Sequence, residues 1–184
     1  MRISEILTKY ISDNKKKHGT DKNKCDKLSH CYGLAYDGIF KPFDRNAELD
    51  IIEIGIEFGD SLLAWKEFFP NANISGIDIK DKVENKRNDI EYIFIDVRDF
   101  KPSKEYDIVI DDGSHKLKDV IYTVKNFKLK RGGVMIIEDC QAPNHWFEAI
   151  KKNTKYSIEC IDLRQVNKRY DDYLIILRNH GYNL

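Results

Sequence analysis

The stretch Ile51-Ile-Glu-Ile-Gly-Ile-Glu-Phe-Gly-Asp-Ser61 decides the fold of this chain. A run of apolar residues leads into Gly55, a second glycine follows at Gly59, and an amphipathic segment begins directly afterwards. This order predicts a buried strand, a tight loop and a helix, in which Gly55 lets the backbone approach a ligand and Gly59 tolerates the turn. A Gly-x-x-x-Gly spacing on its own fits a purely structural turn equally well. The rest of the chain has to decide between the two interpretations.

Short β-branched runs alternate with amphipathic segments from about Asp50 onwards, which is typical of repeated β-α-β units. Several runs, such as Ile108-Val-Ile110 and Val134-Met-Ile-Ile137, are continuously apolar, as expected for strands buried on both faces. Strands are predicted over residues 50–56, 73–78, 90–96, 106–111, 133–138, 156–162 and 173–178. Helices are predicted over residues 1–13, 61–69, 116–127 and 144–152.

The last two predicted strands have no clear helix between them, because residues 167–172 are few and mostly charged. We therefore expect an antiparallel hairpin at one edge of the sheet. The whole pattern predicts an α/β fold: a Rossmann-like, seven-stranded, mostly parallel sheet with helices on both faces and an antiparallel terminal strand.

The composition predicts one globular domain and limits its partners. A chain of 184 residues suits a single domain, with an N-terminal helix and lid-like segment over residues 1–45 and a Rossmann-like core over residues 46–184. Lys plus Arg and Asp plus Glu both number 31, so there is no broad positive field and nucleic acid is not an expected partner. No apolar run reaches the ~18 residues of a membrane span, so no membrane partner is expected either. The four cysteines form no C-x-x-C pair, so we expect reduced thiols and a cytoplasmic protein.

Three successive predicted strands end in residue types that suit a cofactor. The first ends at Gly55. Asp78 ends the second strand, about 20 residues after the glycines, where an acid can bind ribose hydroxyls, and Asp96 ends the third, where it can receive an adenine amino group. Each acid alone is typical of a turn, but the series favours a nucleoside-containing cofactor. A dinucleotide is the rival ligand, yet Glu57 occupies the second glycine position of the G-x-G-x-x-G fingerprint and would repel a pyrophosphate.

Two further motifs carry a resemblance to a known family. They are Tyr106-Asp-Ile-Val-Ile-Asp-Asp-Gly-Ser-His115 and Leu129-Lys-Arg-Gly-Gly-Val-Met-Ile-Ile-Glu-Asp139, and they accompany Glu53-x-Gly-x-x-x-Gly-Asp-Ser-Leu62 and His18-Gly-Thr-Asp-Lys22. Across roughly residues 18–150 the chain resembles the metal-dependent O-methyltransferases of macrolide biosynthesis, the mycinamicin and tylosin sugar methyltransferases. It is also similar to sequences labelled rhamnosyl O-methyltransferase or cephalosporin hydroxylase.

The resemblance implies a class I methyltransferase fold that binds S-adenosylmethionine at the carboxyl ends of the strands. Together with Asp78 and Asp96, which end their predicted strands, the candidate cofactor residues are Glu53, Gly55, Gly59, Ser61, Asp111, Thr20 and Lys22. The resemblance assigns Asp112, Glu138 and Asp139 to Mg²⁺ and makes His115 the catalytic base. It also makes residues 19–22 and 30–32 part of a lid over the cofactor.

The residue types agree with a metal centre. Asp112 follows one predicted strand and Glu138-Asp139 ends the next, and neighbouring strands lie about 4.8 Å apart. Carboxylate oxygens suit Mg²⁺, or Mn²⁺ or Ca²⁺, rather than zinc. Alternatively, Asp112 and Ser114 cap the helix predicted at 116–127, which leaves Glu138-Asp139 unexplained. His115, beside these acids at a helix start, is expected to stay neutral and to accept a proton from a hydroxyl.

Two groups of residues have competing interpretations. Four possible zinc ligands lie close together in the sequence, although their spacing matches no standard zinc finger: His18, Cys25, His30 and Cys31. Four aromatic residues are expected either at the rim of an acceptor pocket or in ordinary core packing: Tyr32, Tyr36, Trp146 and Phe147.

The sequence therefore predicts an O-methyltransferase that depends on S-adenosylmethionine and a divalent metal and acts on a sugar hydroxyl, such as that of rhamnose in a glycan or glycosylated metabolite. A vicinal diol suits such a centre because it offers the metal two oxygens. Two alternatives remain open: a metal-independent small-molecule methyltransferase, and a catalytically silent S-adenosylmethionine-binding subunit. The chain is also a candidate homo-oligomer, or a module of a larger glycan-modifying polypeptide.

Overall fold

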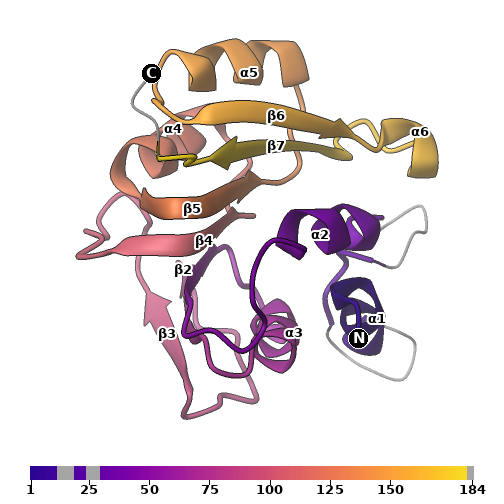
Figure 1. Cartoon of the computed structure of the whole chain (residues 1–184), viewed down its shortest axis with the longest axis vertical. Helices are drawn as coiled ribbons and strands as arrows, with labels where there is room; N and C mark the ends of the chain where they lie inside the picture. Colours follow the sequence, from indigo (N-terminus) through magenta and orange to yellow (C-terminus); the bar gives the residue numbers. More distant parts are fainter. Residues whose placement is uncertain (12–18, 24–29, 182–184) are drawn as a thin grey trace.

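The computed structural model describes residues 1–11, 19–23 and 30–181 and contains one seven-stranded sheet (Figure 1). Across the sheet the strands follow the order β3-β2-β1-β4-β5-β7-β6. Neighbouring strands are parallel except at β7, which runs antiparallel to both β5 and β6. The strands are β1 (Asp50–Ile54), β2 (Asn73–Asp78), β3 (Ile90–Phe94), β4 (Glu105–Asp111), β5 (Lys128–Ile137), β6 (Ser157–Asp162) and β7 (Tyr173–Arg178).

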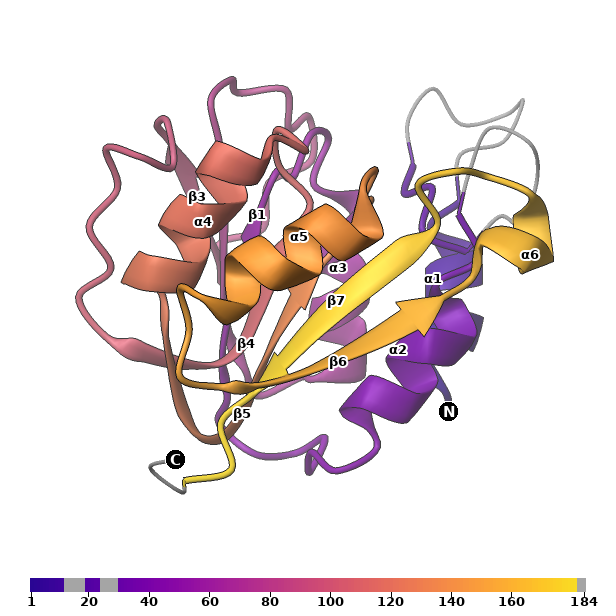
Figure 2. The ribbon, with the colours of Figure 1, turned by 90° about the horizontal axis from the view of Figure 1, so that it is seen from above.

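Helices cover both faces of the sheet (Figure 2). One face packs against α1 (Ile3–Lys9), α2 (Gly33–Phe40) and α3 (Asp60–Phe68), and the other packs against α4 (Leu117–Asn126) and α5 (Pro143–Lys151). A single short helix, α6 (Arg164–Asn167), lies between β6 and β7. Because successive side chains of a strand point to opposite faces, Ile51 and Ile52 belong to different hydrophobic cores. Burial on both faces explains why these strands are so uniformly apolar.

The predicted α/β class, the seven strands and the reversed terminal strand are confirmed. β2 and β7 have the predicted bounds, whereas β1 and β3 end two residues earlier because the chain turns there into loops. β5 begins at Lys128 rather than Gly133. The Gly132-Gly133 pair, which suggested a break, falls at a register shift against β4, and Gly132 has a φ of +82°.

Helix α2 is not predicted by the sequence pattern. Two glycines and an aspartate give the segment Gly33-Leu-Ala-Tyr-Asp-Gly-Ile-Phe40 a weak intrinsic helix propensity. The helix is supported by Tyr36, Ile39 and Phe40, which are buried in the same core as α1 and α3. Tertiary packing, rather than local propensity, therefore stabilises α2.

Part of the predicted N-terminal segment, including His18 and Cys25, lies outside the described residues. Within the described part of the chain, Cys140 and Cys160 carry free thiols. Cys31 is disulfide-bonded, so the expectation of uniformly reduced thiols is wrong at this position.

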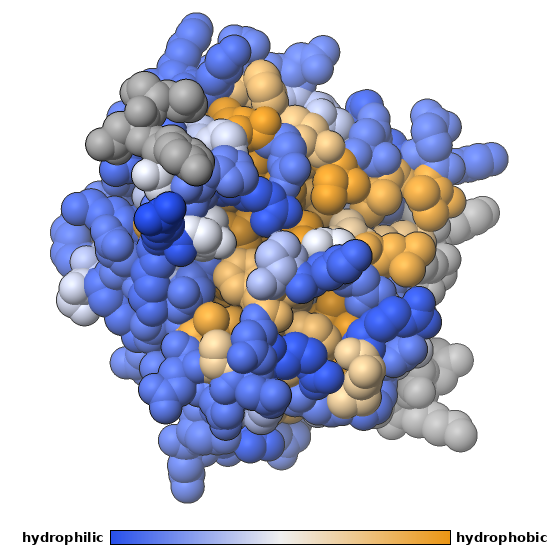
Figure 3. Space-filling view, in the orientation of Figure 1, coloured by the Kyte–Doolittle hydropathy of each residue, from blue (hydrophilic) through white to orange (hydrophobic). Residues whose placement is uncertain are grey.

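Hydrophobic residues are unevenly distributed over the surface. In the view of Figure 3 they extend from the middle of the face towards its upper right, and hydrophilic residues cover most of the rest. Ile161 and Leu163, at the end of β6, are only partly buried, so the core is less completely covered at this edge of the sheet.

The longest helix, α4, has ten residues, and none of the helices in the described ranges has the length and hydrophobicity required to cross a lipid bilayer.

The strand order creates a topological switch at the centre of the sheet. β1 continues through α3 to β2 on one side, and β4 continues through α4 to β5 on the other. Because α3 and α4 lie on opposite faces, the loops after β1 and β4 diverge at the carboxyl ends of their strands. Open α/β sheets bind ligands at such a point.

Candidate active site

The loop after β1 meets the loop after β4 with no side chain between them. Gly55 has a φ of +83°, and a Cβ atom at this position would lie 2.1 Å from the backbone oxygen of Asp112. The Gly55 amide also donates to the carbonyl of Ile77 at 2.8 Å, which ties the loop to β2. Any larger residue would separate the two loops. The close contact between the backbones of Gly55 and Asp112 therefore requires a glycine at position 55. The same contact places the glycine loop beside Asp112.

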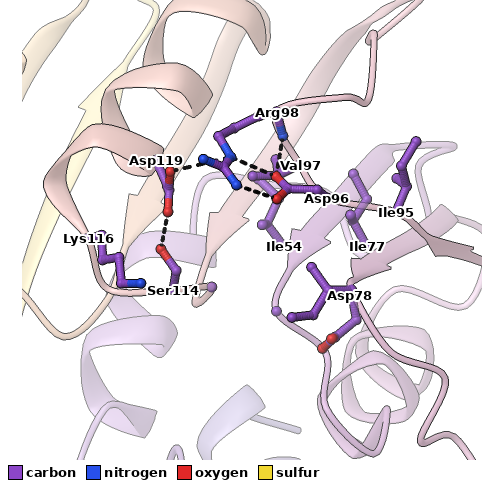
Figure 4. A pocket seen from close by; sticks show the side chains of 13 residues that line it. Ile54, Ile77, Asp78, Ile95, Asp96, Val97, Arg98, Ser114, Lys116 and Asp119 are labelled. Carbon is purple, nitrogen blue, oxygen red and sulfur yellow. Dashed lines mark hydrogen bonds and ion pairs between the residues drawn. The ribbon is translucent and has the colours of Figure 1, made fainter.

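A pocket of about 310 Å³ opens on one side of Gly55 (Figure 4). Aliphatic side chains at the ends of adjacent strands, including Ile77 and Ile95, form much of its wall. Asp78 also lines the pocket, and one of its oxygens accepts hydrogen bonds from two backbone amides of the glycine loop at 2.9 and 3.1 Å. Asp78 thus holds the loop, and an ionised carboxylate has room for further donors. The mixture of an apolar wall and one carboxylate suits a nucleoside.

Asp96 lines the same pocket, but its carboxylate is already paired. Arg98 donates to it through Nε and Nη2 at 2.9 and 2.6 Å, and these bonds lower the pKa of Asp96. Figure 4 shows the guanidinium lying between Asp96 and Asp119, and Ser114 donates to Asp119 at 2.6 Å. An adenine amino group at this position would share Asp96 with Arg98.

A second pocket, of about 270 Å³, also borders the glycine loop. Its lining includes four of the residues that the sequence assigned to the cofactor, Thr20, Lys22, Gly55 and Ser61. Gly55 lines both pockets, so the two meet at the glycine loop. Asp112 lines the second pocket as well, which brings the predicted metal ligand to the predicted cofactor site.

Lys22 is buried at the centre of a group of carboxylates. Its Nζ lies 2.6 Å from Asp112, 2.8 Å from Glu138 and 3.3 Å from Glu53. Burial alone would lower the pKa of Lys22, but the three carboxylates outweigh it and raise the pKa, so the ammonium stays charged. Glu53 in turn accepts a hydrogen bond from Ser61 at 2.7 Å. Lys22 therefore links the segment 19–23 to β1, β4 and β5 as a buried counter-ion.

Asp112, His115 and Asp139 form a cluster at the carboxyl edge of the sheet. Nε2 of His115 lies 3.9 Å from Asp112 and 3.8 Å from Asp139. One ligand atom from each of the three residues lies within 4.8 Å of the others, which allows them to share a cation. His115 and Asp139 have φ values of +51° and +55°, and such backbone strain is concentrated at functional sites.

Glu138 lies deeper than the predicted metal site. Its side chain is 2% exposed, one oxygen accepts a hydrogen bond from the Tyr36 hydroxyl, and the other accepts one from Lys22. Burial raises the pKa of Glu138, and the charges of Asp112 and Asp139 raise it further against the opposing effect of Lys22. The structure thus groups His115 with Asp112 and Asp139, whereas Glu138 is turned towards Tyr36 and Lys22.

Asp139 is held from within the protein by residues to which the sequence gave other roles. Tyr32 donates its hydroxyl to Asp139, and His30 stacks on Tyr32 with ring centroids 4.6 Å apart. Nδ1 of His30 lies 2.5 Å from Asp172, and Nε2 lies 3.4 Å from Asp139. Asp172 is missed by the sequence analysis, and the available signal was the acidic pair Asp171-Asp172 directly before the apolar strand β7.

The structure places the remaining predicted residues as follows. Of the two interpretations of the aromatic residues, core packing holds for Tyr32, Tyr36 and Trp146, which are buried, and Phe147 is half-buried. Asp111 is buried and lines neither of the two pockets at the glycine loop.

The N-cap residue of α4 is Lys116, and no side chain makes a capping hydrogen bond there, so Asp112 and Ser114 do not cap this helix. Of the four possible zinc ligands, His30 faces carboxylates, Cys31 is disulfide-bonded, and the other two lie outside the described residues.

The donor set fits a hard divalent cation. Four carboxylates gather around the ammonium of Lys22 and the His115 imidazole: those of Glu53, Asp112, Glu138 and Asp139. Burial, together with the charge of Asp112, raises the pKa of Asp139. A divalent cation would relieve this repulsion, and the carboxylate oxygens of Asp112 and Asp139 suit Mg²⁺ or Mn²⁺.

Curated proteins resemble this chain, although no model of a known protein family matches it. The 8-demethyl-8-alpha-L-rhamnosyl tetracenomycin-C 2'-O-methyltransferase of Streptomyces olivaceus is 31% identical over 146 residues, which cover 71% of this chain and 37% of that enzyme. The mycinamicin VI 2''-O-methyltransferase of Micromonospora griseorubida is 34% identical over 129 residues, which cover 60% of this chain and 31% of that enzyme. The chain thus spans about a third of the length of these curated relatives.

Solved structures share its fold. The MycE methyltransferase from the mycinamycin biosynthetic pathway, in complex with Mg and SAH, matches with a TM-score of 0.68 and 21% identity, over 97% of this chain and 54% of that chain. The fibrillarin of Methanococcus jannaschii matches with a TM-score of 0.53 and 15% identity, over 76% of this chain and 70% of that chain. The chain therefore has the class I methyltransferase fold, and its sequence resembles the macrolide sugar O-methyltransferases, as its motifs predict.

Proposed function

We propose that this chain is an O-methyltransferase that uses S-adenosylmethionine and a divalent metal to methylate a sugar hydroxyl. One observation carries the proposal: two pockets meet at the glycine loop, and the loop contacts Asp112, which clusters with His115 and Asp139. The sulfonium of S-adenosylmethionine lies between its nucleoside and its amino-acid end. A cofactor that fills both pockets therefore has its methyl group near the loop, beside the cluster.

The two pockets suit the two ends of this cofactor. The pocket at Asp78 offers an aliphatic wall to the adenine and a carboxylate to the ribose. The pocket at Thr20 and Ser61 offers hydroxyl groups to the amino-acid end. MycE was solved with SAH, which supports the same cofactor here.

Asp112 and Asp139 are the residues best placed to hold a metal ion, with His115 at its border and Glu138 behind it. A bound divalent cation would acidify and align a hydroxyl of the acceptor. His115 then accepts the hydroxyl proton at Nε2, and Tyr32 keeps the Asp139 carboxylate oriented through its hydrogen bond. The presence of Mg in the MycE structure supports this assignment.

The proposed acceptor is a deoxyhexose such as rhamnose, in a glycan or a glycosylated metabolite. A vicinal diol presents a chelating pair of oxygens to a metal, which a simple alcohol does not. The tetracenomycin relative acts on a rhamnosyl compound by its name, which supports a sugar acceptor. We propose that residues 1–184 form a single domain that acts as a homo-oligomer or as a module of a longer glycan-modifying polypeptide.

One observation favours a second candidate, a metal-independent methyltransferase. The ammonium of Lys22 already contacts Asp112 and Glu138, so part of the negative charge is neutralised without a metal ion. In this version Lys22 orients the carboxylates and His115 alone takes up the proton.

The deciding experiment measures adenosylhomocysteine release with a panel of glycosides, catechols and nucleotides, in Mg²⁺ and after exhaustive chelation. We expect turnover with a glycoside in Mg²⁺ only. Asp112→Asn is expected to abolish this turnover and to leave S-adenosylmethionine affinity nearly intact, whereas the exposed Asp81→Asn serves as a matched control.

Each other outcome selects an alternative. Turnover that survives chelation supports the metal-independent enzyme, and methylation of catechols alone rules out the sugar acceptor. Binding of S-adenosylmethionine without transfer to any member of the panel supports a silent binding subunit.

A further inference from the structure

A third cavity lies at the same edge of the sheet, beyond β5. Its volume is about 540 Å³, and its polar lining consists of Asn144, His145, Asp162, Arg164 and Tyr173. These residues come from the start of α5, the end of β6, α6 and the start of β7. None of them belongs to either pocket at the glycine loop.

The strand register places this cavity next to the carboxylate cluster. The amide of Cys140, directly after Asp139, donates to the carbonyl of Tyr173 at 3.1 Å. Tyr173 in turn is paired with Asp162 across β7 and β6. Neighbouring strands are about 4.8 Å apart, so the cavity begins roughly one strand away from Asp139. A ligand whose reacting group lies at the cluster can extend into it.

The cavity walls have the chemistry of a carbohydrate site. Arg164 and Asp162 form a planar fork, with Nε and Nη2 donating to the carboxylate at 2.9 and 2.6 Å. The guanidinium lies over the Tyr173 ring at 5.4 Å from its centroid. Donors and acceptors fixed in one plane match adjacent sugar hydroxyls, and an aromatic ring suits the C–H face of a pyranose.

The apolar part of the lining consists of short side chains and the Tyr173 ring. The described residues that complete the lining are small, namely Ala142, Pro143 and Cys160, and no large aliphatic side chain joins them. An apolar ring placed here would remove the Arg164–Asp162 pair from water without giving new hydrogen bonds. This desolvation of the ion pair costs free energy. A second sugar replaces the lost water with hydroxyl groups.

We propose that this cavity binds the unit to which the methylated sugar is attached, and that this unit is itself a sugar, so the acceptor is an oligosaccharide. The proposal rests on the sugar O-methyltransferase function proposed above. It adds a specificity site formed by Asn144, Asp162, Arg164 and Tyr173, which touches the acceptor without touching the reacting hydroxyl.

The test compares three acceptors that share the sugar methylated in the glycoside panel: its methyl glycoside, a disaccharide ending in it, and its octyl glycoside. We expect the disaccharide to have a KM about 10-fold lower than the methyl glycoside, since one or two added hydrogen bonds to charged groups give this difference. The octyl glycoside is expected to gain nothing. Arg164→Ala and Asn144→Ala should each remove most of the disaccharide's advantage and leave the methyl glycoside's kcat and KM unchanged.

Arg178→Ala is the matched control, because Arg178 pairs with Glu159 on the same two strands but away from the cavity. Equal KM values for the disaccharide and methyl glycoside, or an advantage that survives both cavity variants, would overturn the proposal. A preference for the octyl glycoside would do so as well, and would assign the cavity to an apolar aglycone.

Binding separates this proposal from the proposed function. Saturation-transfer NMR with disaccharides, in adenosylhomocysteine and Mg²⁺, reports occupancy of the cavity without turnover. If no acceptor is methylated but disaccharide binding is present and is lost in Arg164→Ala, the proposed function fails and the sugar site stands. If no disaccharide binds, or binding is unaffected by Arg164→Ala and Asn144→Ala, the sugar site is rejected whatever the enzymatic result.

Discussion

At the residue scale, Asp78 supports the glycine loop and lines the candidate nucleoside pocket at the same time. Asp78→Ala is therefore expected to weaken S-adenosylmethionine binding by about 1–3 kcal/mol, because both the loop contacts and the ribose contacts are lost. Titration calorimetry measures the change. Asp81→Ala is the control, since Asp81 is exposed and bonds within its own loop outside the pocket. Unchanged affinity in Asp78→Ala, or binding of NAD by the wild type, would contradict the assignment.

His115 is the candidate base, and its backbone conformation determines which variant tests it fairly. The φ of +51° is tolerated better by Asn than by most other residues, so His115→Asn removes the imidazole with little change in backbone strain. We expect kcat to fall about 10²–10⁴-fold on the true acceptor, as for loss of a general base, with S-adenosylmethionine affinity unchanged. His180→Asn, at an exposed position, is the control. A kcat within a few-fold of the wild type would exclude His115 as the base.

At the element scale, ion pairs join the amino ends of the central strands, opposite the candidate site. Asp50 of β1 pairs with Lys104 and, at 2.7 Å, with Lys130, which also contacts Asp107 at 2.8 Å. Burial alone would raise the pKa of Asp50, but the two ammonium groups outweigh it and lower the pKa. A carboxylate with a lowered folded-state pKa stabilises the fold above its unfolded pKa, near 3.8, and this contribution is lost as the pH falls through the folded pKa.

Asp50→Asn is accordingly expected to reduce the free energy of unfolding at neutral pH by roughly 1 kcal/mol, and this effect is expected to decline as the pH falls below 3.8 and through the lower folded-state pKa. Urea unfolding across this range measures the difference between variant and wild type. The exposed neighbour Glu48 supplies the control variant Glu48→Gln, which is expected to change little. A loss for Asp50→Asn that stays constant down to the lowest pH would show that the ion pairs are not its cause.

At the scale of the whole molecule, the buried carboxylates connect segments that are distant in sequence. Lys22 brings the N-terminal segment to β1, β4 and β5, and His30 brings it to the start of β7. The cluster contains more carboxylates than cationic side chains. A divalent ion that binds the folded cluster in preference to the unfolded chain therefore stabilises the whole fold by mass action.

Mg²⁺ is therefore expected to raise the melting temperature, and at about 100 times its dissociation constant it would add about 2.7 kcal/mol. Differential scanning calorimetry at increasing Mg²⁺ concentration measures the shift. Asp112→Asn should abolish it, whereas Asp107→Asn, at the opposite edge of the sheet, should retain it. A shift of equal size in Asp112→Asn would mean that Mg²⁺ binds elsewhere.

The sequence by itself determined what depends on neighbouring residues along the chain. Apolar runs and helical periodicity predict the strands and most helices, because burial on two faces or on one face leaves a local pattern. The glycine loop after β1, Asp78 at the end of β2 and Asp112 after β4 could be assigned in the same way, since parallel strands bring their carboxyl ends to one edge. The order of the elements then predicts the class I fold.

Only the tertiary structure decided which side chains meet. Lys22 contacts Asp112 across 90 residues and Glu138 across 116, and His30 contacts Asp172 across 142. These contacts turn Glu138 inward, place Tyr32 and Tyr36 on the acids instead of on an acceptor, and group His115 with Asp112 and Asp139. No local pattern encodes them, because each depends on where the packed sheet and helices place two distant segments. The strand ends therefore follow from the sequence, and the partners of the acids there follow from the packing.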